Sequence, residues 1–432
     1  MTTTTYILIF VYYIISIFNI LFLFTRYRIC PELLWSVFQF FMFFGITQLI
    51  DNAYPSDELL LLLYVIALLS FIIGSSFARA ISKPRKMIEI ERRPDLYKIR
   101  SPYVWVMMIV SIVLCSIFFA RAGGNVFING IRAMISDTVY STKYSRKGIL
   151  SVSGVGYIYQ FRVTVFPILV LYYALIKRKS SVTAVLVVLM FTFIVGTGQR
   201  GGLFSFLVIV LVTVYYLYTT HKAPVEAERK KQPNNRLLYI SVVGISGVLF
   251  GLSTILNGRV AEGSTVFAAT IKRLLNDNQS CAIKGFRYIT NEPIQYGKDW
   301  LMQMIDILPG SNRYVSLDTR IFAFMHGGST AGTSPPCIWG SAYYNFGIFG
   351  VIMLSFILGI VMAGIHAQYS KKVNDEFSII IYSAKQFLLA YWVAAGPIVL
   401  FNSGFVAVLL LDFILTSIAL KYRFVFGKVK MI

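Results

Sequence analysis

The sequence predicts an all-α protein that crosses a membrane many times, with about eleven transmembrane helices and one large extramembrane loop. The chain of 432 residues is 57% apolar and 16% aromatic, and only 14% of its residues are charged. These proportions lie outside the range of soluble domains and are typical of a polytopic membrane protein. The N-terminus has no basic cluster before its apolar run, which favours a first span over a cleaved signal.

A helix needs about 20 mainly apolar residues to cross the hydrocarbon core of a bilayer. The sequence offers eleven such segments, at 6–24, 33–50, 58–78, 103–120, 156–176, 182–196, 203–219, 237–256, 341–366, 378–400 and 405–420. No internal repeat or low-complexity linker divides them, so we expect a single transmembrane domain over residues 1–432.

Basic residues predict which side of the membrane each linker faces. Alternate linkers and the C-terminal tail carry 24 of the 40 Lys and Arg residues. By the positive-inside rule these linkers are cytoplasmic, which puts the N-terminus outside and the C-terminus inside. The same rule accounts for the net charge of +21 without a nucleic-acid partner.

Two polar segments then face outward, at 121–155 and 257–340. The first includes an amphipathic stretch at 126–134 that is suited to the membrane surface. The second is the only long segment that is neither an apolar span nor a strongly charged linker. Cys281 and Cys337 lie in it, and their spacing alone does not decide whether they form a disulfide.

A glycine-rich turn between the sixth and seventh expected spans is a candidate anion site. Backbone amides of Gly198, Gly201 and Gly202 would form a nest for a negative group, and Arg200 adds a planar donor fork suited to phosphate. A tight hairpin turn whose arginine reaches the lipid headgroups explains the same residues.

The large loop carries further basic candidates. Arg313 and Arg320 are seven residues apart, which places them on one face if the piece is helical, where two forks could hold a diphosphate. They could equally pair with Asp306 and Asp318 as a solvated surface. Arg259 is a weaker candidate for the same role.

Ionisable residues inside expected spans are costly and are usually functional or paired. Arg162 lies about six residues inside the fifth span and is a candidate for diphosphate binding. Lys385 and Asp412 lie at a similar depth, roughly 10 to 13 Å from the cytoplasmic end at 1.5 Å per residue. We therefore expect Lys385 and Asp412 to form a structural pair.

Proton transfer has three candidates in the large loop. His326 precedes a glycine-rich turn, and an imidazole titrates near neutral pH. Asp318 and Glu292 are the acidic alternatives. The three histidines are scattered, and the external acidic residues include no Asp-x-Asp pair, so the sequence predicts no metal and no cofactor.

The order of these features resembles the O-antigen polymerases, the oligosaccharide repeat-unit polymerases of bacterial inner membranes. The recognisable residues are Gln199-Arg200-Gly201-Gly202, Tyr296-Gly297-Lys298-Asp299-Trp300, Ile307-Leu308-Pro309 and the run Trp339 to Gly350. Members of the family often carry an acidic residue where this chain has Ser341, so a mechanism that relies on that carboxylate would not apply here.

The resemblance implies a metal-independent glycosyltransferase on a membrane fold of the type found in O-antigen ligases. The donor would be a growing glycan on undecaprenyl diphosphate, and the acceptor a fresh lipid-linked repeat unit in the periplasm. A separate co-polymerase would set the chain length, and membrane lipids surround the protein. Preorganised arginines would stabilise the departing diphosphate.

Two other functions fit the same sequence features. An O-antigen ligase uses the same donor but delivers the glycan to a lipid-A core. A lipid-linked oligosaccharide flippase would instead show short external loops, which the loop of about 80 residues at 257–340 argues against.

Overall fold

The computed structural model describes residues 2–136, 155–177, 181–198, 201–219, 276–308, 314–330, 332–425 and 428–431, with three isolated positions between 244 and 248. The chain folds as two compact units. The first comprises Met1–Met87, Thr270–Lys371 and Leu388–Phe401, and the second comprises Ile88–Ala269, Lys372–Phe387 and Asn402–Ile432. Each unit is described by itself.

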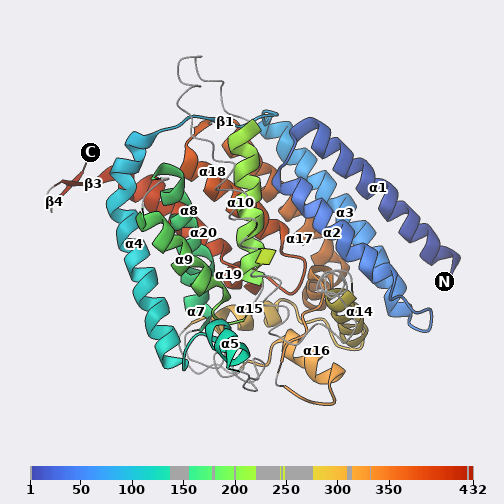
Figure 1. Ribbon diagram of the computed structural model, residues 1–432. Helices are drawn as coiled ribbons and strands as arrows, with labels where there is room; N and C mark the ends of the chain where they lie inside the picture. The colour runs from blue at the N-terminus through green and yellow to red at the C-terminus, as the bar shows by residue number, and fades with distance from the viewer. Residues whose placement is uncertain are drawn as a thin grey trace. The chain divides into compact units, whose positions relative to one another are not determined.

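The first unit contains long apolar helices and the short helices of the large loop (Figure 1). They are α1 (Thr3–Tyr27), α2 (Pro31–Thr47), α3 (Pro55–Ser82), α14 (Asn278–Ile289), α15 (Lys298–Ile305), α16 (Leu317–Met325) and α17 (Ile338–Ser370). Helix α3 packs against both α1 and α17, and α14 packs against α2 and α3.

Helices α3 and α17 cross at two glycines. A Cβ on Gly74 would lie 2.2 Å from the carbonyl oxygen of Phe356, and a Cβ on Gly359 would lie 2.4 Å from that of Phe71. Small residues of this kind let the backbones of membrane helices approach closely. The crossing therefore depends on both positions.

We expect Gly359→Leu to destabilise this crossing by about 1 to 3 kcal/mol, the range for overpacking a close contact. Gly364→Leu is a matched control on the same helix, because a Cβ there has no neighbour within 4 Å. Thermal unfolding of the purified protein in detergent measures the difference. Equal melting temperatures for the two variants would contradict the packing role of Gly359.

A buried ion pair joins α2 to α3. The Arg79 side chain donates from Nη2 and Nε to Oε1 of Glu32, at 2.9 and 3.1 Å, and Glu32 is completely buried. The Arg79 guanidinium also lies 4.6 Å from the centre of the Tyr27 ring. Arg79 lies in the last turn of α3 and Glu32 in the first turn of α2, so the ion pair joins these two helix ends.

The second unit contains the remaining helices and two small sheets. They are β1 (Glu89–Ile90), α4 (Pro94–Arg121), α5 (Val126–Ile135), α7 (Val155–Tyr159), the π-helical turn η1 (Gln160–Val165), α8 (Phe166–Ile176), α9 (Ser181–Val195), α10 (Gly201–Thr219), β2 (Val373–Asn374), α18 (Glu376–Ala390), α20 (Phe405–Phe413), η3 (Ile414–Ile418), α21 (Ala419–Lys421), β3 (Tyr422–Val425) and β4 (Lys428–Met431). Strands β1 and β2 pair in parallel, and β3 and β4 pair antiparallel. The last residues of α18 belong to the first unit.

The expected pair between Lys385 and Asp412 is confirmed. The Lys385 Nζ lies 2.5 Å from Oδ2 of Asp412, and the two side chains are 7% and 18% exposed. The pair joins α18 to α20. A second buried pair in this unit joins Arg100 of α4 to Asp375 at the start of α18.

Six of the described helices are long and apolar enough to cross a membrane: Thr3–Tyr27, Pro55–Ser82, Pro94–Arg121, Gly156–Ile176, Gly201–Thr219 and Ile338–Ser370. Two shorter apolar helices are Pro31–Thr47 and Ser181–Val195. The chain is therefore mostly helical with the character of a multi-pass membrane protein. The described residues do not confirm the count of eleven spans, and the expected span at 237–256 lies almost entirely outside them.

The segment expected to span from 378 to 400 is not one helix. Helix α18 ends at Ala390, and the short helix α19 (Ile398–Asn402) begins eight residues later. Between them Ala394 pairs with Cys337 in an isolated bridge, and Ala395 has a positive φ of 61°. Pro397 directly precedes α19 and disfavours a helix through residues 393–396, because proline has no amide hydrogen and restricts the residue before it.

Helix α17 is interrupted near its start. Phe346 and Gly347 have non-helical backbone angles, and Gly347 has a φ of 62°, which favours glycine. The carbonyl oxygens just before this kink are taken by the large loop. The amide of Gln295 donates to Tyr344, at 2.9 Å, and the amide of Gly297 donates to Asn345, at 3.2 Å.

Candidate functional site

The described part of the large loop folds onto the first turns of α17. Helices α14 and α16 share a small apolar core with that region, made by Ile289, Leu317, Ile321 and Tyr344. Ser316 starts α16 by accepting a hydrogen bond from the amide of Thr319. Residues 314–316 are not helical, so the condition under which Arg313 and Arg320 would share one helical face is not met.

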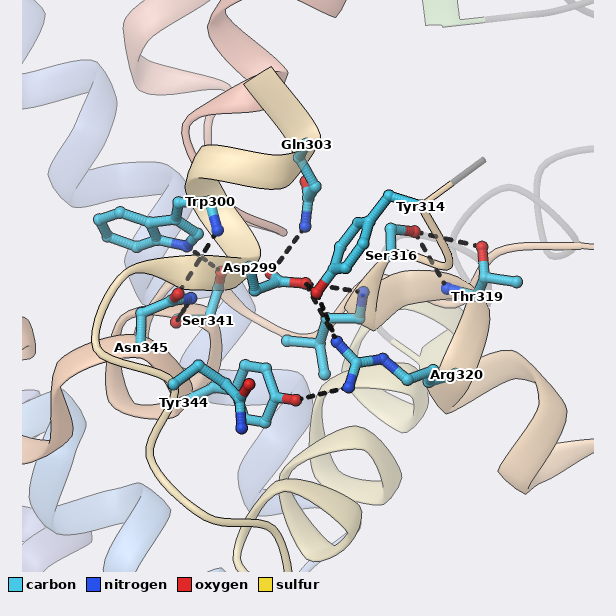
Figure 2. Close-up of polar contacts among 12 residues, drawn as sticks. Asp299, Trp300, Gln303, Tyr314, Ser316, Thr319, Arg320, Ser341, Tyr344 and Asn345 are labelled. Carbon is cyan, nitrogen blue, oxygen red and sulfur yellow. Dashed lines mark hydrogen bonds and ion pairs between the residues drawn. The ribbon is translucent and has the colours of Figure 1, made fainter. Parts of the chain in front are cut away.

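Asp299 is the centre of a polar cluster between α15 and α16 (Figure 2). Its carboxylate is completely buried and accepts hydrogen bonds from Gln303 Nε2, at 2.7 Å, and from the Tyr314 hydroxyl, at 3.1 Å. The backbone amide of Leu317 and Nη2 of Arg320 also donate to it, each at 3.2 Å. A buried charge with this many donors is compensated, as burial requires.

Arg320 donates to Oδ1 of Asp299, the same oxygen that accepts from Tyr314. Besides Asp299, its guanidinium donates to the hydroxyls of Tyr344, at 2.7 Å, and Tyr314, at 3.0 Å. The side chain is 27% exposed, and its Nε has no hydrogen-bond partner among the described residues. The sequence offered Asp306 and Asp318 as ion-pair partners for Arg320, as the alternative to diphosphate binding. In the structure Arg320 instead forms an ion pair with Asp299.

Asp318 lies in the first turn of α16, two residues before Arg320. Burial, and then the charge of Asp299, raise the pKa of Asp318 to about 7. At neutral pH such a carboxyl is partly protonated and partly ionised, whereas an ordinary aspartate is almost fully ionised. Of the three proton-transfer candidates, Asp318 therefore has the environment that suits the role.

The other two candidates lie in different surroundings. Burial, followed by a hydrogen bond to Glu292, raises the pKa of Tyr288 to about 12, so Glu292 serves as an acceptor for a tyrosine hydroxyl. His326 ends α16 and is exposed, with its ring 4.2 Å from that of Phe322.

Ser341 takes part in a neutral hydrogen bond beside the cluster. It is buried, and its Oγ accepts from the indole Nε1 of Trp300, at 2.9 Å. The amide of Trp300 is 3.4 Å from the side-chain oxygen of Asn345. A Cβ on Gly396 would lie 2.7 Å from the Trp300 indole nitrogen, so a larger residue at position 396 would clash with the indole ring.

Sequence reasoning missed Asp299, Tyr314 and Tyr344 as site residues. Asp299 was present in the Tyr296 to Trp300 motif, and Tyr344 in the run after Trp339. Their position in these motifs was the available signal. Their contacts depend on the tertiary arrangement of α15, α16 and α17, which spacing does not give.

Arg162 lies in the second unit and is buried, with an exposed fraction of 2%. Its Nη1 donates to the carbonyl oxygens of Phe193, at 2.8 Å, and Ile194, at 2.6 Å, at the end of α9. The last carbonyls of a helix have no partner within the helix. These bonds therefore give Arg162 a structural role as a cap for α9.

The glycines of the expected anion nest also lie in the second unit. Gly198 has a φ of 70°, which favours glycine, and a Cβ on Gly202 would lie 2.7 Å from Val163. A Cβ on Gly201 would have no neighbour within 4 Å. The backbone angle at position 198 and the close packing at position 202 thus explain why these residues are glycines. Neither reason applies to Gly201.

Three arginines of the expected diphosphate site, Arg200, Arg259 and Arg313, lie outside the described residues. Cys281 and Cys337 are both free thiols rather than a disulfide. Cys337 is buried and caps α17, because its Sγ accepts from the amide of Gly340 at 3.3 Å. In the described part of the chain, no three His, Cys, Asp or Glu residues are grouped to hold a metal ion.

Comparison with protein-family models, with curated proteins and with solved structures gave no match to this chain.

Proposed function

We propose that this chain is a glycosyltransferase of a bacterial inner membrane that lengthens an oligosaccharide carried on undecaprenyl diphosphate, as the O-antigen polymerases do. The growing glycan leaves undecaprenyl diphosphate and passes to the non-reducing end of a fresh lipid-linked repeat unit in the periplasm. The N-terminus is then periplasmic and the C-terminus cytoplasmic. No metal takes part in the proposed reaction.

The observation that carries the proposal is the cluster on α16. A carboxyl group at Asp318 and a guanidinium at Arg320 lie two residues apart, both beside the buried carboxylate of Asp299. Glycosyl transfer without a metal needs a proton acceptor for the incoming hydroxyl and positive charge for the departing diphosphate. The cluster contains one group of each kind.

The proposed step exchanges one bond at the anomeric carbon for another. The acceptor oxygen forms a bond to the anomeric carbon of the donor glycan while the bond from that carbon to the diphosphate oxygen breaks. The hydroxyl proton passes to the ionised carboxyl of Asp318, and undecaprenyl diphosphate leaves as an anion. In this proposal Arg320 binds the departing diphosphate, and Arg313 of the same loop is a further candidate.

Lengthening of purified lipid-linked repeat units by the purified protein tests the proposal. We expect a ladder of products in nanodiscs that contain the protein and no other enzyme, in the presence of a metal chelator. A ladder that needs an added divalent cation would contradict the metal-independent reaction. No ladder with either mixture would contradict a polymerase.

Deletion of the gene separates polymerase from ligase in the cell. Loss of a polymerase leaves a single repeat unit on the lipid-A core, whereas loss of a ligase leaves none. Loss of a flippase also leaves none, but purified lipid-linked repeats would then not be lengthened in vitro. A bare core together with an intact in vitro ladder would show that the ladder is not the main cellular reaction.

A further inference from the structure

Helix α15 has its polar and apolar faces reversed with respect to a helix that packs on a protein core. Asp299 and Gln303 are four residues apart, lie on one face, and are 0% and 6% exposed. Figure 2 shows both side chains on the side of α15 that faces Tyr314 and Arg320. The inward face of α15 is therefore hydrophilic.

The opposite face is apolar and uncovered. Leu301 and Met304 are three residues apart on one stripe and are 60% and 42% exposed. Just outside the helix Tyr296 and Leu308 are 83% and 67% exposed. Exposed apolar groups that cluster in this way mark a surface with a partner.

The uncovered face continues onto a candidate transmembrane helix. The ring of Trp300 in α15 contacts that of Phe346 in α17, with centroids 5.5 Å apart. The backbone amide of Gly297, just before α15, donates to Asn345 of α17. Phe346, Phe349 and Met353 are exposed on α17, which is long and apolar enough to cross a membrane. The apolar face of α15 thus borders a surface that a bilayer would cover.

We propose that α15 lies in the membrane interface, with its Leu301 and Met304 face in contact with the acyl chains of bilayer lipids. A helix with one apolar and one polar face binds at the boundary of headgroups and acyl chains in this way. Here the polar face is turned to the protein instead of to water, because Asp299 and Gln303 are hydrogen-bonded there. The occupant is the bilayer itself.

The charges at the ends of α15 fit this placement. Lys298 at its start is exposed, and a lysine side chain can reach lipid phosphates while its stem stays apolar. Asp306 after its end is also exposed and would stay in water. The Asp299 and Arg320 cluster would then lie at the depth of the lipid headgroups. This placement does not rest on the proposed glycosyl transfer.

Fluorescence quenching tests the proposal on the full chain in lipid nanodiscs that contain no lipid-linked sugar. Leu301→Cys and Met304→Cys, each in a Cys281→Ser background, are labelled with an environment-sensitive fluorophore; the other three cysteines are buried. Phe349→Cys is the control for lipid contact, and Ser329→Cys, in the exposed turn after α16, is the control for water.

We expect lipids with a nitroxide near the headgroup end of the acyl chain to remove most of the fluorescence at both α15 positions, as at Phe349→Cys. Iodide in the water should quench Ser329→Cys much more strongly than either. Strong iodide quenching at the α15 positions, without quenching by nitroxide lipids, would show a water-exposed face and overturn the proposal. Protection from both quenchers would show that protein covers the face and would overturn it equally.

Discussion

Replacing Asp318 by asparagine is expected to lower the rate of glycan lengthening about 10²- to 10⁴-fold, the usual contribution of a general base. Asparagine keeps the shape of the side chain but cannot accept the proton of the acceptor hydroxyl. Rates are measured on purified lipid-linked repeat units with equal amounts of folded protein. Asp306→Asn, at an exposed carboxyl beyond the end of α15, is the matched control and should retain activity.

The pH dependence of the lengthening rate tests whether Asp318 is the general base. A base must be ionised, so the rate of the unmodified protein should rise as the pH rises through about 7, the pKa of Asp318.

The stability of the folded protein should change with pH in the opposite direction. The pKa of Asp318 is raised from 3.8, so its contribution to folding is fully present below about pH 4 and is lost as the pH rises through about 7.

Two other variants complete the assignment of the base. Glu292→Gln and His326→Ala should keep the pH profile, because neither group has the environment of Asp318. A loss of activity in His326→Ala with an unchanged rate in Asp318→Asn would transfer the role to the histidine.

Replacing Asp299 by alanine is expected to cost about 3 to 5 kcal/mol in the stability of the large loop, the usual effect of removing one partner of a buried ion pair. Gln303, Tyr314 and Arg320 would lose their shared acceptor, and the guanidinium would lose its compensating charge. Since 1.4 kcal/mol is a factor of ten, the loop should open more than about 100-fold more often.

Limited proteolysis measures this opening. Cleavage within residues 276–330 should become much faster in Asp299→Ala, whereas Asp306→Ala should be cleaved at the rate of the unmodified protein. Asp299→Asn keeps the size of the side chain and should have an intermediate rate. Equal cleavage of all four proteins would mean that the cluster does not hold the loop.

The sequence allowed good prediction of helices that are determined locally. Long apolar runs placed α1, α3, α4 and α17, because the hydrophobic length of a span is a property of the segment itself. Similar depth in two spans was enough to predict the pair of Lys385 and Asp412, because a buried charge needs a partner. Such inferences do not require knowledge of how distant segments meet.

The wrong predictions concern helix boundaries inside the chain and ion-pair partners that are set by the tertiary structure. Ser316 begins α16 three residues after Arg313, which removes the assumed helical spacing. The Gly396-Pro397 step lies inside the expected span at 378–400 and was a visible signal against one continuous helix. Arg320 selects Asp299 over two acidic residues nearer in sequence, and spacing gives no sign of that choice.

The kink at Phe346 and Gly347 determines where the large loop can move. The carbonyl oxygens of Tyr344 and Asn345 accept hydrogen bonds from the amides of Gln295 and Gly297. The loop thus supplies donors that the interrupted helix α17 lacks at its kink. Lifting it would leave two carbonyls of a membrane helix without donors, which is costly in a dry environment. The large loop is therefore anchored to α17 at Gln295 and Gly297, whereas Gly327 and Gly328 have positive φ angles and a Cβ there would meet nothing within 4 Å.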